Sequence, residues 1–291
     1  MDINYELYKV FYHVASTLSF SEASKQLFIS QSAVSQSIKT LERKLDQVLF
    51  IRSTKKVQLT PEGEIRLRHS EPAMHLIQRG ESQRLDAAST GGQIRSGASD
   101  TICRYFLVPY LKKFHEAVPN AHIKVVNQTS IKCVELLESG QVDLIVVNYP
   151  NSYLSNVSSI KKIKKFHDVF IANQDFAELK GKKLSYQELS KYPILMLDKH
   201  STTSEYLHRL FQQHQLDLVP EIELTSNDLL IDLARIGLGI AFIPNFCLSE
   251  QTCDLFAVQT EEELPERELV IAYNEQVLTS KAAKEFLSFF D

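Results

Sequence analysis

One short segment, residues 29–45, combines polar side chains of the kind that contact DNA. Small polar residues stand where a stable helix favours Ala, Leu or Glu, and at about 100° per residue they share one face with two basic residues. This row consists of Gln31, Ser32, Ser35, Gln36, Lys39 and Arg43. Gln can form paired hydrogen bonds to adenine, while Lys and Arg attract phosphates. We therefore expect this face to contact double-stranded DNA.

An apolar stripe runs along the same segment, roughly 130° away from the polar row. The stripe consists of Val34, Ile38, Leu41 and Leu45. This pattern is typical of a helix that buries one face against its neighbours. Ser30, expected beside the DNA, is a good N-cap for the helix. Asp46 stands where the helix should end, because Asp tolerates the left-handed conformation of a helix exit.

The neighbouring elements predict a winged helix-turn-helix. Apolar residues at helical spacing indicate a first helix over 7–18, and a second short helix follows with Ser21 as its expected N-cap. The stretch VLFIRSTKKVQLT alternates apolar and polar residues about a basic tip, which is typical of a two-stranded wing. In this motif the second helix of the pair enters the major groove. The expected DNA contacts therefore also include Ser21, Arg52, Lys55 and Lys56.

Charge and composition agree with this interpretation. The chain of 291 residues carries a net charge of −4, yet residues 21–58 hold seven basic and three acidic residues. A local basic patch on an acidic chain is a footprint of nucleic acid. No apolar run approaches the roughly 20 residues of a membrane span, and the N-terminus lacks the pattern of a signal peptide. We expect a cytoplasmic protein with no membrane partner.

A long helix is predicted over residues 61–88. Thr60 is its cap and Pro61 its first-turn residue, and an acidic residue follows near the positive end of the helix dipole. Pro72 predicts a kink or a break. No domain surrounds the helix to bury its apolar side, so we expect a partner helix to do so. That side consists of Ile65, Met74, Leu76 and Ile77.

From residue 91 onward, strands alternate with helices, which predicts an α/β region of parallel sheets with crossover helices. Strands are expected in GQIRSGAS, HIKVVNQ, DLIVVNY, YPILML, EIELT, LGIAFIP and ERELVIAYN. Helices are expected over 103–117, 130–140, 204–215 and 227–235, and in SKAAKEFLSFF. Two similar half-domains would together occupy residues 91–291.

The stretch FYHVASTLSFSEASKQLFISQSAVSQSIKTLERKLDQVLFIRSTKKVQLTPEGE resembles the DNA-binding segment of the LysR-type transcriptional regulators of bacteria, without a gap. The resemblance extends over the whole chain. It implies a winged helix-turn-helix in 1–60, a linker and dimerisation helix in 61–90, and a two-lobed effector domain in 91–291, similar to periplasmic binding proteins. Lobe I would comprise about 91–160 and 266–291, and lobe II about 161–265. The chain would cross between the lobes near 150–165 and 262–268.

The resemblance implies a sequence-specific transcriptional regulator that forms a homodimer or homotetramer, with RNA polymerase as a further partner. Two residues depart from the family pattern, which commonly has Pro where Ser32 stands and Gly where Asp46 stands. Ser32 replaces an apolar contact suited to a thymine methyl group by a hydroxyl that can bond to several bases. The preferred operator should therefore differ from the usual one.

The family binds small molecules in the crevice between the lobes, at strand-to-helix turns that are rich in hydroxyl groups in this sequence. Helix N-termini expose N–H groups and a partial positive charge, so these turns suit a carboxylate or another small anion. Asp100 stands apart, because its carboxylate would repel an anion unless it turns away or pairs with a cationic part of the ligand. The candidate effector residues are Ser99, Asp100, Thr101, Thr129, Ser130, Asn148, His200, Ser201, Thr202, Thr203, Thr225 and Ser226.

Other function classes remain as alternatives. Cys103 and Cys133 stand in the first turns of expected helices, where the helix dipole lowers the pKa of a thiol, so a regulator triggered by cysteine oxidation is one alternative. Cys247 and Cys253 form no CxxC or zinc-type spacing with them. An enzyme or a solute-binding protein is a more distant alternative, because no catalytic motif is recognisable. No metal or cofactor is expected.

Overall fold

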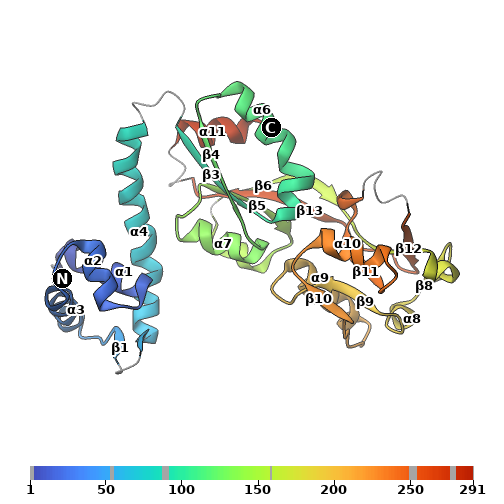
Figure 1. Ribbon diagram of the computed structural model, residues 1–291, viewed down its shortest axis with the longest axis horizontal. Helices are drawn as coiled ribbons and strands as arrows, with labels where there is room; N and C mark the ends of the chain where they lie inside the picture. Colours follow the sequence, from blue (N-terminus) through green and yellow to red (C-terminus); the bar gives the residue numbers. More distant parts are fainter. Residues whose placement is uncertain are drawn as a thin grey trace. The chain divides into compact units, whose positions relative to one another are not determined.

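The computed structural model describes residues 3–52, 56–86, 92–157, 159–248, 254–275 and 280–290 (Figure 1). The chain divides into two compact units. The N-terminal unit comprises residues 1–85 together with 139–141, and the C-terminal unit comprises residues 86–138 and 142–291. The helix predicted from residue 61 therefore belongs to the same unit as the first sixty residues.

The N-terminal unit contains three short helices, a two-stranded wing and one long helix. These elements are α1 (Tyr5–Thr17), α2 (Phe20–Leu27), α3 (Gln31–Leu45), β1 (Phe50–Arg52), β2 (Val57–Leu59) and α4 (Pro61–Asp86). β1 and β2 pair antiparallel, with Ile51 opposite Gln58. Val34, Ile38 and Leu41 are completely buried in the core between the helices. The predicted wing and the predicted buried stripe of α3 are both confirmed.

The ends of the short helices follow local capping chemistry. The Ser30 hydroxyl accepts a hydrogen bond from the Ala33 N–H at 3.2 Å, and Asp46 adopts a left-handed φ of 52° at the end of α3, as predicted. The prediction of Ser21 as the cap of α2 is wrong. Ser19 caps that helix instead, accepting from the Glu22 N–H at 3.2 Å. The helix starts earlier because Phe20, its first residue, is buried in the core.

Helix α4 begins as predicted, since the Thr60 hydroxyl accepts a hydrogen bond from the Gly63 N–H at 3.0 Å. A Cβ atom at Gly63 would lie 2.3 Å from the carbonyl oxygen of Leu49, so only glycine allows this close approach. Of the kink or break that we predicted at Pro72, the break is absent, because the helix continues through this residue. Proline removes one hydrogen bond of a 26-residue helix, and Met74, which is 4% exposed, anchors the next turn against Tyr5 of α1.

The C-terminal unit contains two mixed sheets with helices packed against them. The first has the strand order β4-β3-β5-β13-β6 and the second β10-β9-β11-β7-β12-β8. The strands are β3 (Gln93–Ala98), β4 (His122–Asn127), β5 (Leu144–Tyr149), β6 (Ser159–Phe166), β7 (Asp168–Ala172), β8 (Lys183–Leu184), β9 (Ile194–Leu197), β10 (Ile222–Leu224), β11 (Ile240–Pro244), β12 (Phe256–Thr260) and β13 (Arg267–Tyr273). We call each sheet with its helices a lobe.

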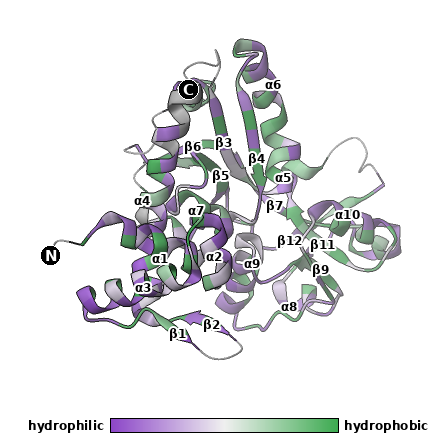
Figure 2. Cartoon of the chain, turned by 60° about the vertical axis from the view of Figure 1, so that its left-hand side comes forward, coloured by the Kyte–Doolittle hydropathy of each residue, from purple (hydrophilic) through white to green (hydrophobic). Residues whose placement is uncertain are grey.

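The helices of this unit are α5 (Asp100–Ile102), the π-helix η1 (Cys103–Leu107), α6 (Val108–Ala117), α7 (Ser130–Glu138), α8 (Tyr186–Leu189), α9 (Thr202–Gln213), α10 (Asn227–Arg235) and α11 (Lys281–Ser288). Short 3₁₀ helices are η2 (Ser152–Asn156), η3 (Gln174–Leu179) and η4 (Asn245–Cys247). Figure 2 shows hydrophobic residues along the central strands and mixed hydropathy on the helices. Strands β9 and β11 are buried throughout, as expected for strands covered on both faces.

All seven predicted strands are present, and the parallel pairing of β3 with β4 and β5, and of β9 with β10 and β11, agrees with the predicted crossovers. Four strands were not predicted, namely β6, β7, β8 and β12. The predicted lobe boundary at 160/161 is wrong, because β6 pairs with β13 along its length in the first sheet. The chain crosses at His167, between β6 and β7, and returns over residues 261–266.

A buried ion pair joins the two crossings. Asp168 is the first residue of β7 and Arg267 is the first residue of β13, and Arg267 Nη1 lies 2.6 Å from Asp168 Oδ2. Their side chains are 0% and 1% exposed, respectively. The guanidinium lies 5.3 Å from the ring centre of Phe166 and 4.7 Å from that of Tyr206. The pair therefore fixes the two strand starts in a desolvated, aromatic environment.

Replacing one partner of this pair should leave an uncompensated buried charge. We expect Arg267→Met to reduce the free energy of unfolding by about 3–5 kcal/mol. The double variant Arg267→Met/Asp168→Leu should recover much of that loss, because neither charge is then buried. Urea unfolding of all three variants, including Asp168→Leu alone, measures the coupling. Strictly additive losses would contradict a direct interaction between the two side chains.

Candidate functional site

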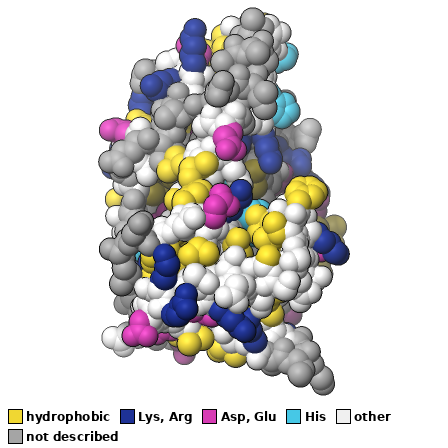
Figure 3. Space-filling model, turned by 90° about the vertical axis from the view of Figure 1, so that its left-hand side faces the viewer, with side chains coloured by type: hydrophobic (Ala, Val, Ile, Leu, Met, Phe, Trp, Pro, Cys, Tyr) yellow, Lys and Arg dark blue, Asp and Glu magenta, His cyan; other side chains and the backbone are white. Residues whose placement is uncertain are grey.

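The predicted polar row of α3 lies on the surface of the N-terminal unit. Ser35 is partly exposed, and the remaining five members, Gln31, Ser32, Gln36, Lys39 and Arg43, are exposed. Figure 3 views the molecule from the left-hand side of Figure 1, and Lys and Arg side chains lie at several places on the lower part of that face. At the start of the row, the hydroxyl oxygens of Ser30 and Ser32 lie 2.9 Å apart. The row is therefore accessible to a large polar partner.

Arg52, predicted as a DNA-contacting residue of the wing, is exposed and also makes contacts within the N-terminal unit. Its Nη1 donates to the Ser35 hydroxyl at 3.2 Å, its Nη2 lies 3.6 Å from a carboxylate oxygen of Glu42, and its guanidinium lies 4.5 Å from the ring centre of Phe20. These contacts tie β1 to α2 and α3. Arg52 thus supports the orientation of the polar row.

The structure describes one of the two other basic residues at the wing tip. Lys56 is exposed, whereas Lys55 lies outside the described residues. Ser21 is exposed in the first turn of α2, and its carbonyl oxygen accepts a hydrogen bond from the Ser24 hydroxyl.

The structure adds a candidate that the sequence analysis did not select. Phe28 is 95% exposed in the turn between α2 and α3, with a left-handed φ of 55°, and its neighbour Ile29 is 40% exposed. An apolar pair between the end of one helix and the cap of the next was the available signal in the sequence. Both residues directly precede Ser30, so they extend the exposed row at its N-terminal end.

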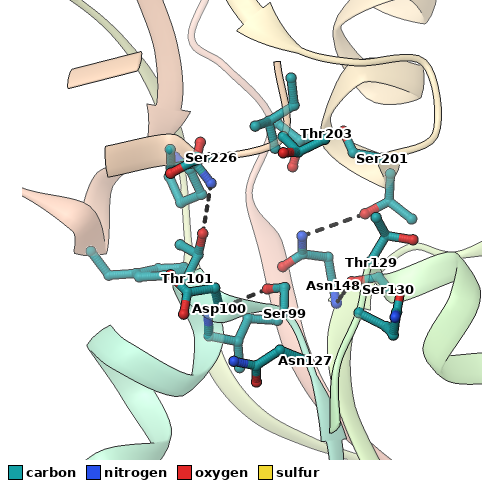
Figure 4. A pocket seen from close by; sticks show the side chains of 18 residues that line it. Ser99, Asp100, Thr101, Asn127, Thr129, Ser130, Asn148, Ser201, Thr203 and Ser226 are labelled. Atoms are coloured by element: carbon teal, nitrogen blue, oxygen red, sulfur yellow. Dashed lines mark hydrogen bonds between the residues drawn. The ribbon is translucent and has the colours of Figure 1, made fainter. Parts of the chain in front are cut away.

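In the C-terminal unit, the predicted turns come together around one cavity of about 440 Å³ between the lobes (Figure 4). The predicted residues that line it are Ser99, Asp100, Thr101, Thr129, Ser130, Asn148, Ser201, Thr202, Thr203, Thr225 and Ser226. His200 does not line this cavity, and it is exposed on the loop before α9 with its N–H bonded to Asp198. Residues that we did not select also line the cavity, namely Ile102, Asn127, Gln128, Leu197, Asn227, Pro244 and Phe246.

Two amide side chains cross the crevice in opposite directions. Asn227 of the second lobe donates from Nδ2 to the Thr101 hydroxyl of the first lobe at 2.9 Å. Asn148 of the first lobe donates from Nδ2 to the Thr202 hydroxyl of the second lobe at 3.4 Å. The Oδ1 atoms of both amides are buried and have no hydrogen-bond partner among the described residues. Each amide therefore joins the lobes and has one buried oxygen without a partner among the described residues.

Four of the lining hydroxyls cap helices. Ser99 accepts from the Ile102 N–H at 3.3 Å, Thr129 from the Lys132 N–H at 3.3 Å, and Ser201 from the Ser204 N–H at 3.0 Å. Ser226 accepts from the Leu229 N–H at 3.4 Å. Helix starts thus face the cavity from both lobes and add partial positive charge there. The first turns of α7, α9 and α10 all meet the cavity.

Asp100 is the one ionisable residue among the described residues that line the cavity. It is exposed, and one of its carboxylate oxygens lies 3.9 Å from Arg104 Nη2. Arg104 Nε also lies 3.5 Å from a carboxylate oxygen of Asp228 in the second lobe. The carboxylate of Asp100 is thus paired with Arg104 of the protein itself, a partner that the sequence analysis did not select.

The cysteines do not have the lowered pKa values that their positions suggested. Burial, with a smaller effect of Asp100, raises the pKa of the Cys103 thiol to about 11. Burial and the neighbouring Cys103 raise that of Cys133 to about 12. Burial also raises the pKa of Cys247, and Cys253 lies outside the described residues. Within the described ranges, His, Cys, Asp and Glu side chains form no cluster suited to a metal ion.

Comparison with known protein families identifies both halves of the chain. Residues 5–64 match the model "Bacterial regulatory helix-turn-helix protein, lysR family", and residues 87–291 match the "LysR substrate binding domain". The chain belongs to the LysR family. It is a DNA-binding transcriptional regulator of the LysR type with an effector-binding domain. In the part of the chain that the structure describes, no helix is long and apolar enough to span a membrane.

Curated relatives cover most of the chain at moderate identity. The "Probable RuBisCO transcriptional regulator" of Thalassiosira pseudonana is 27% identical over 253 residues, which are 84% of this chain and 81% of that protein. The "HTH-type transcriptional activator CmpR" of Synechocystis sp. is 27% identical over 287 residues, covering 97% of this chain and 93% of the relative.

Solved structures confirm the fold over the full length. CbnR, a LysR family transcriptional regulator, aligns with a TM-score of 0.62 at 17% identity and covers 98% of this chain and 97% of its own. Full-length OxyR from Pseudomonas aeruginosa aligns with a TM-score of 0.69 at 17% identity, covering 99% and 94%. The predicted architecture of a winged helix-turn-helix, a long helix and a two-lobed effector domain is confirmed.

The raised thiol pKa predicts slow alkylation of Cys103. Because the thiolate is the reactive form, iodoacetamide should label Cys103 about 100-fold more slowly at pH 7.5 than it labels a thiol of pKa 9. The rate should rise about tenfold per pH unit up to pH 9. Mass spectrometry of the full chain, with Cys103→Ser to assign the peptide, measures the rate. A rate that levels off below pH 8 would show a reactive thiolate and favour the oxidation-triggered alternative.

Proposed function

We propose that this regulator reads its operator with the exposed row of α3 and responds to a small anionic molecule bound in the crevice between its lobes. The convergence of the hydroxyl-rich turns of both lobes on one cavity carries the second part of the proposal. The exposure of the α3 row above a completely buried stripe supports the first. Since the target is promoter DNA, we place the protein in the cytoplasm.

Direct reading of bases falls to Gln31, Ser32 and Gln36, because their short polar side chains are exposed at the start of α3. Lys39 and Arg43 follow on the same face and would contact phosphates, as would Lys55 and Lys56 of the wing tip. Ser35 and Arg52 would position the row through their mutual hydrogen bond. Phe28 would lie against the sugar edge or a thymine methyl group, since little of its ring is covered by the protein.

The two classes of DNA contact should separate in a salt titration. Gln31→Ala should weaken binding to the preferred operator by about 1–3 kcal/mol and leave binding to random DNA almost unchanged. Lys56→Ala should weaken both alike and reduce the slope of log affinity against log salt by about one.

Fluorescence anisotropy at several salt concentrations measures both effects, with the exposed Lys183→Ala in the C-terminal unit as the control for charge. Equal losses on operator and random DNA for Gln31→Ala would refute the assignment of base reading to this helix.

We infer that the regulator acts as a homodimer or homotetramer through α4. Ile65, Leu76 and Ile77 are 51%, 42% and 41% exposed, so the described residues leave a substantial part of the apolar side of the helix uncovered. A second copy of the same helix would cover it. Sedimentation of Leu76→Glu/Ile77→Glu tests this, because buried charges would separate such a seam. RNA polymerase is a further partner that we infer for a regulator bound at a promoter.

The crevice suits an anion although none of its described lining residues is basic. The first turns of α7, α9 and α10 provide N–H groups and dipole charge, and hydroxyls add donors at fixed positions. A carboxylate is the ligand group that we propose. Ligand contacts to both lobes would stabilise the closed arrangement that the Asn148 and Asn227 hydrogen bonds already favour. The effect on DNA affinity should be modest, on the order of 1–3 kcal/mol, and reciprocal.

Thr101→Val should abolish the response to the effector with little effect on ligand-free DNA binding. Valine nearly keeps the volume but removes the acceptor of the Asn227 hydrogen bond in the crevice. A thermal-shift screen of small carboxylates and amino acids against the full chain first identifies a ligand. Titration of that ligand into Thr101→Val, and into Thr260→Val as a matched control outside the cavity, then measures the affinity. An unchanged response in Thr101→Val would place the effector elsewhere.

The alternatives receive less support from the described residues. Oxidation of Cys103 or Cys133 would require a thiolate that burial disfavours. We infer no catalytic activity, because hydroxyls, amides and one exposed carboxylate line the cavity, and no described lining residue is a histidine or lysine that could serve as a general base. The N-terminal match to the helix-turn-helix family separates the chain from solute-binding proteins.

A further inference from the structure

A second cavity lies on the outer side of α9 in the C-terminal unit. It is an open hollow of about 350 Å³, lined by Ser152 of η2, Lys199 of the loop before α9, and one face of α9. Glu205, His208, Arg209 and Gln212 form that face, since they follow the i, i+3, i+4, i+7 spacing of one side of a helix. The cavity therefore meets both lobes, as the crevice does, but with different side chains.

The basic residues of this cavity lack the acidic partners that basic residues have elsewhere in the unit. Lys162 pairs with Glu268 at 2.7 Å, Lys165 with Glu266 at 2.7 Å, and Arg235 with Asp254 at 2.9 Å. No carboxylate of the described residues lies within 4.0 Å of a side-chain nitrogen of Lys199, His208 or Arg209. Two permanent cations and an imidazole thus meet around one hollow, where Glu205 is the one carboxylate among the described lining residues.

The uncharged groups of the cavity add hydrogen-bond donors. Ser204 lines it and is completely buried, yet its hydroxyl has no hydrogen-bond partner among the described residues. A buried hydroxyl without a partner is costly unless a ligand or a water satisfies it. The one carboxylate, Glu205, already accepts a hydrogen bond from Tyr153 Oη of η2 at 3.2 Å. Donors therefore outnumber free acceptors in this cavity.

We propose that this cavity is a second ligand site, which takes a phosphate group carried by a small molecule or present as the free ion. Phosphate has a net charge near −2 and several strong acceptor oxygens, which match the guanidinium of Arg209, the ammonium of Lys199 and the hydroxyl of Ser204. A monocarboxylate would leave most of these donors unused. The site differs from the crevice, where the described lining residues include no cation.

The two cavities share the first turn of α9. Thr202 and Thr203 line the crevice, whereas Ser204 and Glu205 line the second cavity. A phosphate held between Ser152 and α9 would bridge the same two lobes that the Asn148 hydrogen bond to Thr202 joins. Occupancy of the second site therefore favours the closed arrangement of the crevice and couples the two ligands.

Equilibrium dialysis of the full chain against radiolabelled inorganic phosphate tests the proposal, at constant ionic strength set with sodium chloride. We expect saturable binding of one phosphate per chain by the wild type. Lys199→Gln/Arg209→Gln should weaken it at least tenfold. Lys182→Gln, at an exposed position outside both cavities, should keep the wild-type affinity.

Competition separates the sources of the ligand group. Methyl phosphate that competes at least as well as inorganic phosphate indicates a phosphate ester, and a clear preference for inorganic phosphate indicates the free ion. The proposal is overturned if the wild type shows no saturable binding up to 20 mM, on the order of an upper limit for a useful affinity. It is also overturned if Lys199→Gln/Arg209→Gln, shown to be folded by circular dichroism, binds like the wild type. Stronger displacement of phosphate by malonate or acetate than by methyl phosphate would likewise overturn it.

Discussion

The ion pair between Arg267 and Asp168 is the interaction on which the arrangement of the C-terminal unit depends. It joins the first residues of the two strands that follow the crossings, so it holds the lobes where the chain itself connects them. Arg267 also donates to the Thr203 hydroxyl at 3.2 Å, and Thr203 lines the crevice. The start of α9, which meets both cavities, is thereby attached to the connection. A buried pair with few alternative partners specifies one arrangement, because any other would leave a charge unpaired in the interior.

The crevice combines fixed and exchangeable polar groups. Capping hydroxyls of four helix starts are occupied by backbone N–H groups, and they define the shape of the cavity. The amides of Asn148 and Asn227 are instead shared between the lobes, and each keeps a buried oxygen without a partner. A ligand that satisfies those oxygens, or rotates the amides to use their N–H groups, changes the bonds between the lobes directly. Ligand binding and lobe closure are therefore connected through the same two side chains.

The sequence was informative where local chemistry decides the structure. The buried stripe of α3, the caps Ser30 and Thr60, and the turns after parallel strands depend on residues close in the chain, and the turns converge because the carboxyl ends of parallel strands meet at one edge. The sequence did not predict β6. Its stretch SIKKIKKF loses the alternation of apolar and polar residues at the register shift opposite Leu269 and Val270. The contact of Arg267 with Asp168 links positions 99 residues apart. The hydrogen bond of Arg52 to Ser35 is also distant in sequence, so no local pattern could predict it.

The close contact at Gly63 determines how the N-terminal unit behaves mechanically. A helix of 26 residues is about 39 Å long, and its first turn lies against the carbonyl of Leu49, directly before the wing. Because Gly63 has no side chain, the backbone of α4 packs directly against this carbonyl. Little space then remains for the helix to tilt independently of the wing. A tilt of the C-terminal end of α4 should therefore rotate the wing together with the helix. A larger residue at position 63 would separate α4 from Leu49, and the wing would then follow a tilt of the helix less closely.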